Sequence, residues 1–265
     1  MTVRIERAGA VATVVLSRPE VRNAVDPTTA AELYQAFVEI DQDEGVAVAI
    51  LFGDHGHFCA GYDLKALATG EGVSWGDSLH FGNESGDPPL GPLGPTRLQM
   101  SKPVIAAVAG PAVAGGMELA LWCDLRVMET EAFMGVYCRR WGVPLLDGGT
   151  VRLPRLIGEG RALDLILTGR KVTADEALRI GLCERVVPSG QAHAAALALA
   201  QDIARFPQAC VRSDRRSTLG QAGLSERAAL EQEFAISAPV VLAESVTGAQ
   251  RFSGGKGRHG DREDI

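Results

Sequence analysis

The sequence lacks several features that would place it in whole classes of protein. No uninterrupted apolar run reaches the roughly 18 residues expected of a membrane-spanning helix. The first ten residues, MTVRIERAGA, contain no apolar stretch of signal-peptide length. The net charge is −7, which argues against nucleic-acid binding by bulk electrostatics. We therefore expect a protein that binds neither membranes nor nucleic acid, in which local groups hold any anionic ligand.

Paired cysteines are missing as well. The five cysteines are scattered over 265 residues, and none forms a Cys-x-x-Cys motif. We therefore expect reduced thiols in a cytoplasmic protein and no metal site. The composition, 46% hydrophobic and 22% charged, is typical of a globular protein. The length suits one large domain, or a core with a smaller appendage.

Strand-like and helix-like segments alternate up to about residue 155. Compact apolar runs predict four strands, at Val11–Ser17, Val46–Gly53, Lys102–Gly110 and Cys123–Glu129. Asp26 and Pro27 are expected as the N-cap and first residue of a helix. Leu33, Phe37 and Ile40 form the apolar face of that helix. This alternation predicts an α/β fold.

The last third of the chain is mainly helical in pattern. Helices are predicted at four places, 158–169, 173–182, 191–205 and 223–247. We divide the chain into a core, residues 1–200, and a C-terminal helical region, residues 201–265. The helical region is expected to pack on the core or on another subunit.

The stretch PAVAGGMELALWCD carries the first candidate chemistry. Gly115 and Gly116 precede a helix-like run, with Glu118 in its first turn. The first amides of a helix have no intrahelical partner, and the helix dipole favours negative charge there. A glycine also lets a ligand oxygen approach the backbone closely. The pattern is compatible with an oxyanion site beside an acid/base, and equally with an ordinary helix start.

A second strand-to-helix junction, FCAGYDL, spans Phe58–Leu64. It is either an ordinary loop capped by Asp63 or the source of another backbone donor. Two such junctions in one α/β chain predict a two-donor oxyanion hole, in which two amides hold one acyl oxygen.

Four ordered motifs resemble the enoyl-CoA hydratase/isomerase (crotonase) superfamily. They are HFCAGYDLK, KPVIAAVAGPAVAGGMELALWCD, GGTVRLPRLIG and LTGRKVTADEALRIGLCERVV, and the resemblance covers roughly residues 3 to 210. It implies a crotonase-like spiral of ββα units with a helical C-terminal oligomerisation region, assembling as homotrimers or dimers of trimers. It also implies an acyl-CoA thioester as substrate, with no cofactor apart from the CoA of that substrate.

The same resemblance assigns roles to individual residues. The amides of Tyr62 and Gly115 match the two oxyanion donors, and Glu118 matches the first catalytic carboxylate. Arg22 lies in the first CoA-contact loop, and Lys65 matches a position that approaches the CoA phosphates. Both are otherwise ordinary surface charges. The remaining substrate-binding positions are Ala60, Gly61, Asp63 and Leu64.

The chain departs from the family pattern at one catalytic position. Hydratases of this family usually carry a second glutamate, and here that position falls on Tyr137, which is either a pocket hydrogen-bond donor or a buried aromatic. Counted back from the GGT turn, Asp147 matches a catalytic aspartate of the dienoyl-CoA isomerases. It is either catalytic or a helix cap or turn residue. Arg139 or Arg140 is a candidate partner that would keep Asp147 or Glu118 ionised.

Three functions remain open on these grounds. The first is an enoyl-CoA hydratase that adds water to a 2-enoyl-CoA, with Glu118 as acid/base. The second is an enoyl-CoA or dienoyl-CoA isomerase that uses Glu118, Asp147 or both. The third is a non-catalytic acyl-CoA-binding protein, which CoA ligands would stabilise but which would convert none. Residues 70–95, rich in glycine and proline, are expected to form a loop that shapes the acyl pocket.

Overall fold

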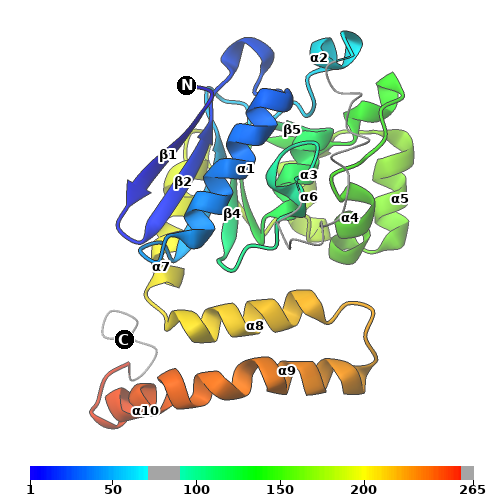
Figure 1. The fold of residues 1–265 in the computed structure, drawn as a ribbon. Helices are drawn as coiled ribbons and strands as arrows, with labels where there is room; N and C mark the ends of the chain where they lie inside the picture. The colour runs from blue at the N-terminus through cyan, green and yellow to red at the C-terminus, as the bar shows by residue number, and fades with distance from the viewer. Residues whose placement is uncertain (71–89, 258–265) are drawn as a thin grey trace.

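An α/β core and a layer of C-terminal helices make up the protein in the computed structural model (Figure 1). The structure describes residues 1–70 and 90–257. Most of the loop predicted at 70–95 and the end of the charged tail therefore lie outside the described residues.

The core is built on a six-stranded sheet. Its strands, in spatial order, are β1 (Val3–Ala8), β2 (Val11–Leu16), β3 (Val48–Gly53), β4 (Val104–Val108), β6 (Leu125–Glu129) and β9 (Arg185–Val187). β1 pairs antiparallel with β2, and the other pairs are parallel. The four predicted strands are confirmed as β2, β3, β4 and β6, and the prediction missed β1 and β9.

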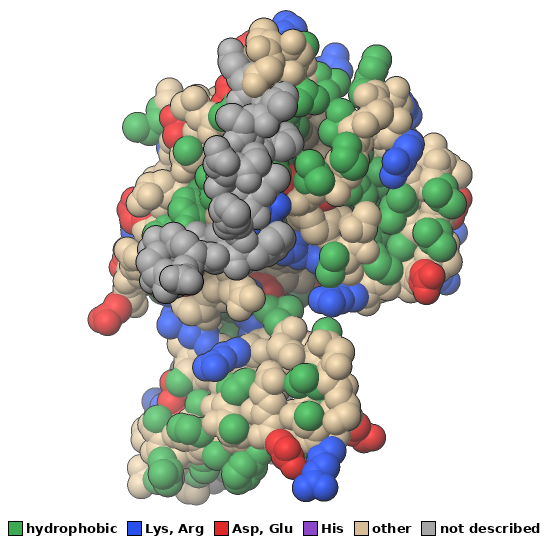
Figure 2. All heavy atoms as spheres, turned by 45° about the vertical axis from the view of Figure 1, so that its right-hand side comes forward, with side chains coloured by type: hydrophobic (Ala, Val, Ile, Leu, Met, Phe, Trp, Pro, Cys, Tyr) green, Lys and Arg blue, Asp and Glu red, His purple; other side chains and the backbone are tan. Residues whose placement is uncertain are grey.

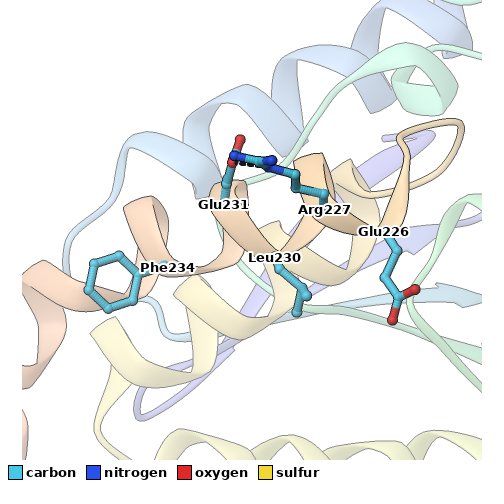
Figure 3. A pocket seen from close by; sticks show the side chains of 5 residues that line it. All are labelled: Glu226, Arg227, Leu230, Glu231 and Phe234. Carbon is cyan, nitrogen blue, oxygen red and sulfur yellow. Dashed lines mark hydrogen bonds and ion pairs between the residues drawn. The ribbon is translucent and has the colours of Figure 1, made fainter.

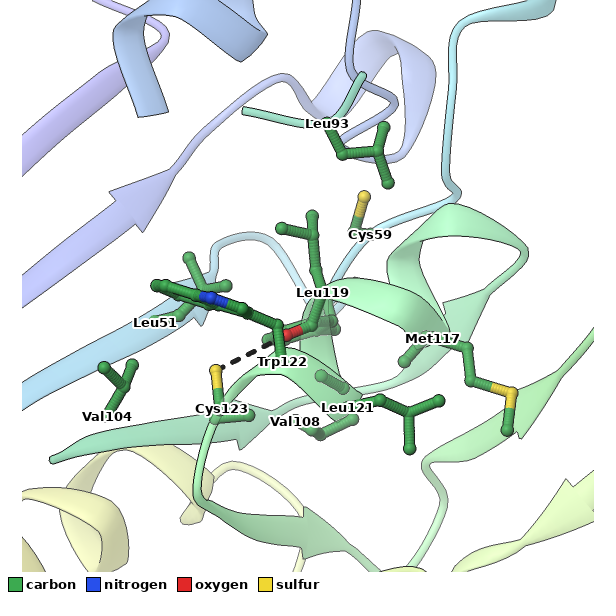
Figure 4. Packing of buried hydrophobic residues seen from close by; sticks show 14 of the residues in the cluster. Leu51, Cys59, Leu93, Val104, Val108, Met117, Leu119, Leu121, Trp122 and Cys123 are labelled. Carbon is green, nitrogen blue, oxygen red and sulfur yellow. Dashed lines mark hydrogen bonds between the residues drawn. The ribbon is translucent and has the colours of Figure 1, made fainter. Parts of the chain in front are cut away.

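The four central strands, β2, β3, β4 and β6, are buried on both faces, which explains their continuous apolar runs. On one face, Val14 and Leu51 pack in a cluster with Phe37 of α1 (Pro27–Gln42). On the other face, Ile50 and Ile105 pack against α7 (Ala192–Ala204). Figure 4 shows part of the first cluster, with Leu51 and Trp122 among its members.

The predicted start of α1 is confirmed. The Asp26 side chain accepts a hydrogen bond from Thr29 N at 2.8 Å, and Pro27 is the first helical residue. This cap satisfies one of the helix's first amides, which have no intrahelical acceptor.

A smaller three-stranded sheet lies beside the first. Its strands, in spatial order, are β5 (Pro111–Val113), β7 (Phe133–Gly135) and β8 (Val172–Thr173). The surrounding helices are α2 (Leu64–Ala68), α3 (Gly115–Trp122), α4 (Gly149–Ile157), α5 (Glu159–Thr168) and α6 (Ala174–Ile180). The 3₁₀ turns are η1 (Pro19–Val21), η3 (Pro95–Arg97) and η4 (Tyr137–Trp141). Because α3 starts two residues after β5, its first amides lie at the end of this small sheet.

The C-terminal helices form a hairpin below the core (Figure 1). It consists of α8 (Gln208–Gly220) and α9 (Glu226–Val240), followed by a π-helical turn, η5 (Val241–Ser245), and α10 (Val246–Ser253). The predicted helix at 223–247 is thus interrupted, because Pro239 lacks the amide that a regular helix requires. An ion pair of 2.8 Å between Arg215 and Asp124 ties α8 to the core. The division at residue 200 remains a prediction.

Candidate active site

Two backbone segments from distant parts of the chain run side by side at the end of β5. Cys59 N donates to the Pro111 carbonyl at 3.1 Å, and Val113 N donates to the Cys59 carbonyl at 3.0 Å. A Cβ placed on Gly61 would lie 2.8 Å from Gly115 N. Gly61 also has φ +91°, a conformation that favours glycine. The structure therefore brings together the two junctions that the sequence predicted as oxyanion donors.

The helix that follows begins where the sequence predicted. Gly115 is the first residue of α3, and Glu118 lies in its first turn. Ala114, just before the helix, has φ +54° and ψ −127°, which is strained for a residue with a Cβ. A Cβ on Gly115 would lie 2.2 Å from Leu93 Cδ1, and one on Gly116 would lie 2.0 Å from the Cys59 carbonyl oxygen. Close packing against backbone thus requires glycine at 116, whereas a side chain at 115 would displace that of Leu93.

Glu118 is buried and held by the N-terminus of another helix. Its side chain Oε1 accepts hydrogen bonds from Asp147 N at 2.9 Å and from Gly149 N at 2.8 Å. A Cβ on Gly149 would come within 2.9 Å of this same oxygen, so the contact depends on glycine. The two amides fix one carboxylate oxygen, which leaves Oε2 as the atom that can exchange a proton.

Burial, together with the nearby charge of Asp147, raises the pKa of Glu118 to about 7. The backbone hydrogen bonds from Gly149 and Asp147 oppose this shift. A carboxyl group with a pKa near neutrality can accept and release a proton in one catalytic cycle. This property distinguishes Glu118 from an exposed glutamate.

We predict that catalysis depends on pH through this group. If Glu118 acts as a base, kcat/KM should rise with increasing pH and level off above an apparent pKa of about 7. The sign follows because only the ionised carboxylate can accept a proton from water. Initial rates measured across pH 5 to 9 would test it, and a profile already flat at pH 5 would contradict a raised pKa.

Asp147 is 5% exposed, and its carboxylate is hydrogen-bonded to a segment distant in the chain, while its catalytic role stays a prediction. Oδ1 accepts hydrogen bonds from Leu93 N at 3.0 Å and from the Thr96 hydroxyl at 2.5 Å. The N-cap of α4 is Gly148, with no side-chain cap, so the helix-cap interpretation is wrong. The amide of Asp147, not its carboxylate, hydrogen-bonds Glu118. Burial raises the pKa of Asp147, against the effect of the Thr96 hydrogen bond.

The arginine beside these carboxylates is not one of the two predicted from the sequence. Arg139 donates to the Ile166 carbonyl at 3.2 Å, and Arg140 lies 3.8 Å from the ring centroid of Tyr137. Arg152 of α4 instead donates to the Asp147 carbonyl at 2.8 Å. In the sequence, only its position one turn into α4 pointed to Arg152. Its contacts with this part of the site include residues distant in the chain.

The predicted CoA-contact segments also lie together. Ala60 N donates to the Arg22 carbonyl at 3.1 Å, and Val25 N donates to the Gly61 carbonyl at 2.8 Å. The side chains of Arg22 and Lys65 are exposed near this junction, as phosphate contacts would require. The structure therefore joins the two segments that the resemblance assigned to CoA, and their role in binding stays a prediction.

Three other predicted substrate-binding residues have defined surroundings. Asp63 is the N-cap of α2, where its side chain accepts from Lys65 N at 3.0 Å, while Leu64 is exposed. Tyr137 lies beside Phe133, with ring centroids 6.1 Å apart. The capping interpretation of Asp63 is confirmed, and substrate contact by these residues remains a prediction.

The thiol of Cys59, in one of the two donor segments, is not activated for reaction. Burial raises the pKa of the Cys59 thiol to about 12, so it stays protonated near neutral pH.

Within residues 1–70 and 90–257, no group of three or more His, Cys, Asp and Glu side chains is arranged to hold a metal ion. None of the described helices combines the length and apolarity needed to cross a membrane.

Comparison with known proteins agrees with this geometry. A family model described as enoyl-CoA hydratase/isomerase matches residues 6–253. Enoyl-CoA hydratase EchA19 of Mycobacterium tuberculosis is 36% identical over 247 residues, which cover 91% of this chain and 88% of the relative. A short-chain-enoyl-CoA hydratase of Clostridium acetobutylicum is 39% identical over 188 residues, covering 69% of this chain and 67% of the relative. The crystal structure of enoyl-CoA hydratase EchA1 from Mycobacterium marinum superposes with a TM-score of 0.86 at 33% identity, covering 96% of each chain.

Proposed function

Because the chain belongs to the enoyl-CoA hydratase/isomerase family, we propose that it adds water across the double bond of a 2-enoyl-CoA thioester. The observation that carries the proposal is the position of Glu118. It is a buried carboxylate with a pKa near 7, on the helix whose first amide is the Gly115 donor.

In the proposed reaction, water attacks the β-carbon and loses a proton to Oε2 of Glu118. The electron pair of the double bond moves toward the thioester, and negative charge develops on its oxygen. The amides of Tyr62 and Gly115 stabilise this charge, and one such donor is typically worth about 3 kcal/mol. The protonated Glu118 then delivers its proton to the α-carbon. One carboxyl group thus serves as base and acid, which would account for the missing glutamate at Tyr137.

Turnover of crotonyl-CoA, followed by loss of the conjugated thioester absorbance, tests this proposal. Conversion of a 3-enoyl-CoA to its 2-enoyl isomer without hydration would instead identify an isomerase. Stabilisation by CoA ligands without any turnover would identify a binding protein. The isomerase alternative is not favoured, because the relatives named above are hydratases.

The proposal extends to assembly as a homotrimer or a dimer of trimers. Apolar side chains gather on the C-terminal hairpin (Figure 2). Leu230 and Phe234 of α9 line a surface hollow with Glu226, Arg227 and Glu231 (Figure 3). Phe234 is 75% exposed, and Leu242 just beyond α9 is 83% exposed. Burial of such side chains between subunits would stabilise the assembly.

We predict that charge on this hairpin disrupts the assembly. Phe234→Glu combined with Leu242→Glu should reduce the molar mass measured by light scattering to that of a monomer, because each glutamate would be buried unpaired at the interface. Leu167→Glu is the matched control, since Leu167 is 70% exposed on α5 in the core. A wild-type protein that is already monomeric would contradict the proposed assembly.

No cofactor is needed beyond the CoA of the substrate, because proton transfer and oxyanion stabilisation use only Glu118 and backbone amides. We also propose a cytoplasmic location, which suits free thiols. All five cysteines are unpaired, and four of them are buried.

A further inference from the structure

Asp147 connects the catalytic glutamate to a second part of the site. Its amide donates to Glu118, whereas its carboxylate holds the segment Leu90–Arg97 through Leu93 N and the Thr96 hydroxyl. Arg152 reinforces this link, since it donates to the Asp147 carbonyl at 2.8 Å and to the Thr96 carbonyl at 2.6 Å. Hydrogen bonds to both its backbone and its side chains thus hold the segment at the N-terminus of α4.

The residue held in this way lies against the oxyanion site. Leu93 is 1% exposed, and its Cδ1 lies 2.2 Å from the place that a Cβ on Gly115 would occupy. Its side chain therefore covers the α-carbon of the residue whose amide is the proposed donor. Figure 4 shows Leu93 pointing toward Cys59, which lies in the other donor segment, Phe58–Leu64.

We propose that Asp147 is a positioning residue that holds Leu93 against Gly115, and that Leu93 restricts the enzyme to acyl groups without a branch at the α-carbon. This inference rests on the proposed hydratase function. When a thioester oxygen binds the Gly115 amide, the α-carbon of the acyl group is one bond beyond the carbonyl carbon, which would place it next to the Leu93 side chain. A methyl group on that carbon would compete with the leucine for the same space.

A positioning role and a proton-transfer role can be told apart at Asp147. A single oxygen, Oδ1, accepts both hydrogen bonds. The amide oxygen of an asparagine can accept the same two bonds but cannot exchange a proton at catalytic pH. Asp147→Asn therefore separates positioning from acid/base catalysis, whereas Asp147→Ala removes both.

The test compares crotonyl-CoA with 2-methylcrotonyl-CoA in five variants. The wild type should prefer the unbranched substrate, since one methyl group in a hydrophobic pocket changes kcat/KM by about 10- to 200-fold. Leu93→Ala, Asp147→Ala and Thr96→Val should each lower that preference by about tenfold. Asp147→Asn should keep it. The control is Thr168→Val, whose hydroxyl donates to the Asp164 carbonyl in α5, and it should also keep the preference.

The opposite pattern would overturn the inference. If Asp147→Asn loses turnover on both substrates as severely as Asp147→Ala, while Thr96→Val keeps the wild-type preference, the carboxylate takes part in proton transfer. An unchanged preference in Leu93→Ala would also overturn it. Should Asp147→Ala fail to fold, Thr96→Val and Leu93→Ala still test whether the position of Leu93 sets the preference for the unbranched substrate.

Binding measurements separate this inference from the proposed function. The dissociation constants of butyryl-CoA and 2-methylbutyryl-CoA require no turnover. A wild-type protein that hydrates neither enoyl thioester would refute the hydratase proposal. In that case, a tenfold change in the binding ratio on Thr96→Val would still support the positioning role, and no change would refute it.

Discussion

Replacing Glu118 with glutamine is expected to lower kcat for crotonyl-CoA hydration by about 10²- to 10⁴-fold, the usual contribution of a general acid/base. The substituted side chain keeps an oxygen that can accept the Asp147 and Gly149 amides, so the local structure should survive. It loses only the ability to exchange a proton. Steady-state rates and the affinity for a CoA product would show whether kcat falls while binding is retained.

Glu129 provides the matched control for this variant. It is also a buried glutamate that accepts a backbone hydrogen bond, from Ala192 N at 3.2 Å, but it lies at the end of β6 beside α7. Glu129→Gln should leave kcat within a few-fold of wild type. Equal losses in the two variants would show that Glu118→Gln acts by damaging the fold.

A stability measurement adds a second signature of Glu118. Its folded-state pKa of about 7 lies above the ordinary value of 4.5, so the folded protein binds this proton more tightly than the unfolded chain does. Its contribution to stability is therefore present below pH 4.5 and is lost as pH rises to about 7, by up to about 3 kcal/mol. Glu118→Gln should remove this pH dependence of the unfolding free energy.

Gly116→Ala is expected to damage both activity and stability. The added Cβ would lie 2.0 Å from the Cys59 carbonyl oxygen, which is backbone and cannot rotate away. The segment carrying Cys59 must shift, and overpacking of this kind typically costs about 1–3 kcal/mol. Because Tyr62 follows in the same segment, its amide would be displaced, and loss of one oxyanion donor lowers kcat by about 10²- to 10³-fold. Urea unfolding and steady-state rates would measure the two effects.

Gly160 of α5 is the control for the same substitution. It is a helical glycine with no atom within 4 Å of an added Cβ. Gly160→Ala should therefore stabilise the protein by about 0.5–1 kcal/mol through helix propensity and leave kcat unchanged. If Gly116→Ala behaved like Gly160→Ala, the close approach of the two donor segments would not exist in solution.

Local sequence signals predicted much of the core correctly. Apolar runs mark β2, β3, β4 and β6 because these strands are buried on both faces. β1 escaped notice because only Val3 of its six residues is buried, and β9 because it has three residues. Pro239 in the sequence indicates a break in the C-terminal helix, but the helical pattern on both sides of the proline obscured this signal.

The same distinction between local and long-range features applies to the active site. Glycines at a helix start and a glutamate in its first turn are local features, and the sequence placed Gly115 and Glu118 correctly at the start of α3, while their catalytic roles stay predictions. The role of Asp147 was not local, since its partners Leu93 and Thr96 are more than 50 residues away in the chain. Spacing to the GGT turn left open catalysis, a helix cap or a turn residue, and the carboxylate does not cap α4. Contacts between distant segments decide such roles.

The most direct test of the proposed reaction is to incubate the protein with crotonyl-CoA in ¹⁸O-labelled water and analyse the products by mass spectrometry. Hydration by Glu118 predicts a 3-hydroxyacyl thioester that is heavier than the substrate by one labelled water, formed by the wild type and far more slowly by Glu118→Gln. Recovery of crotonyl-CoA without label, from a protein that still binds CoA thioesters, would contradict the hydratase function.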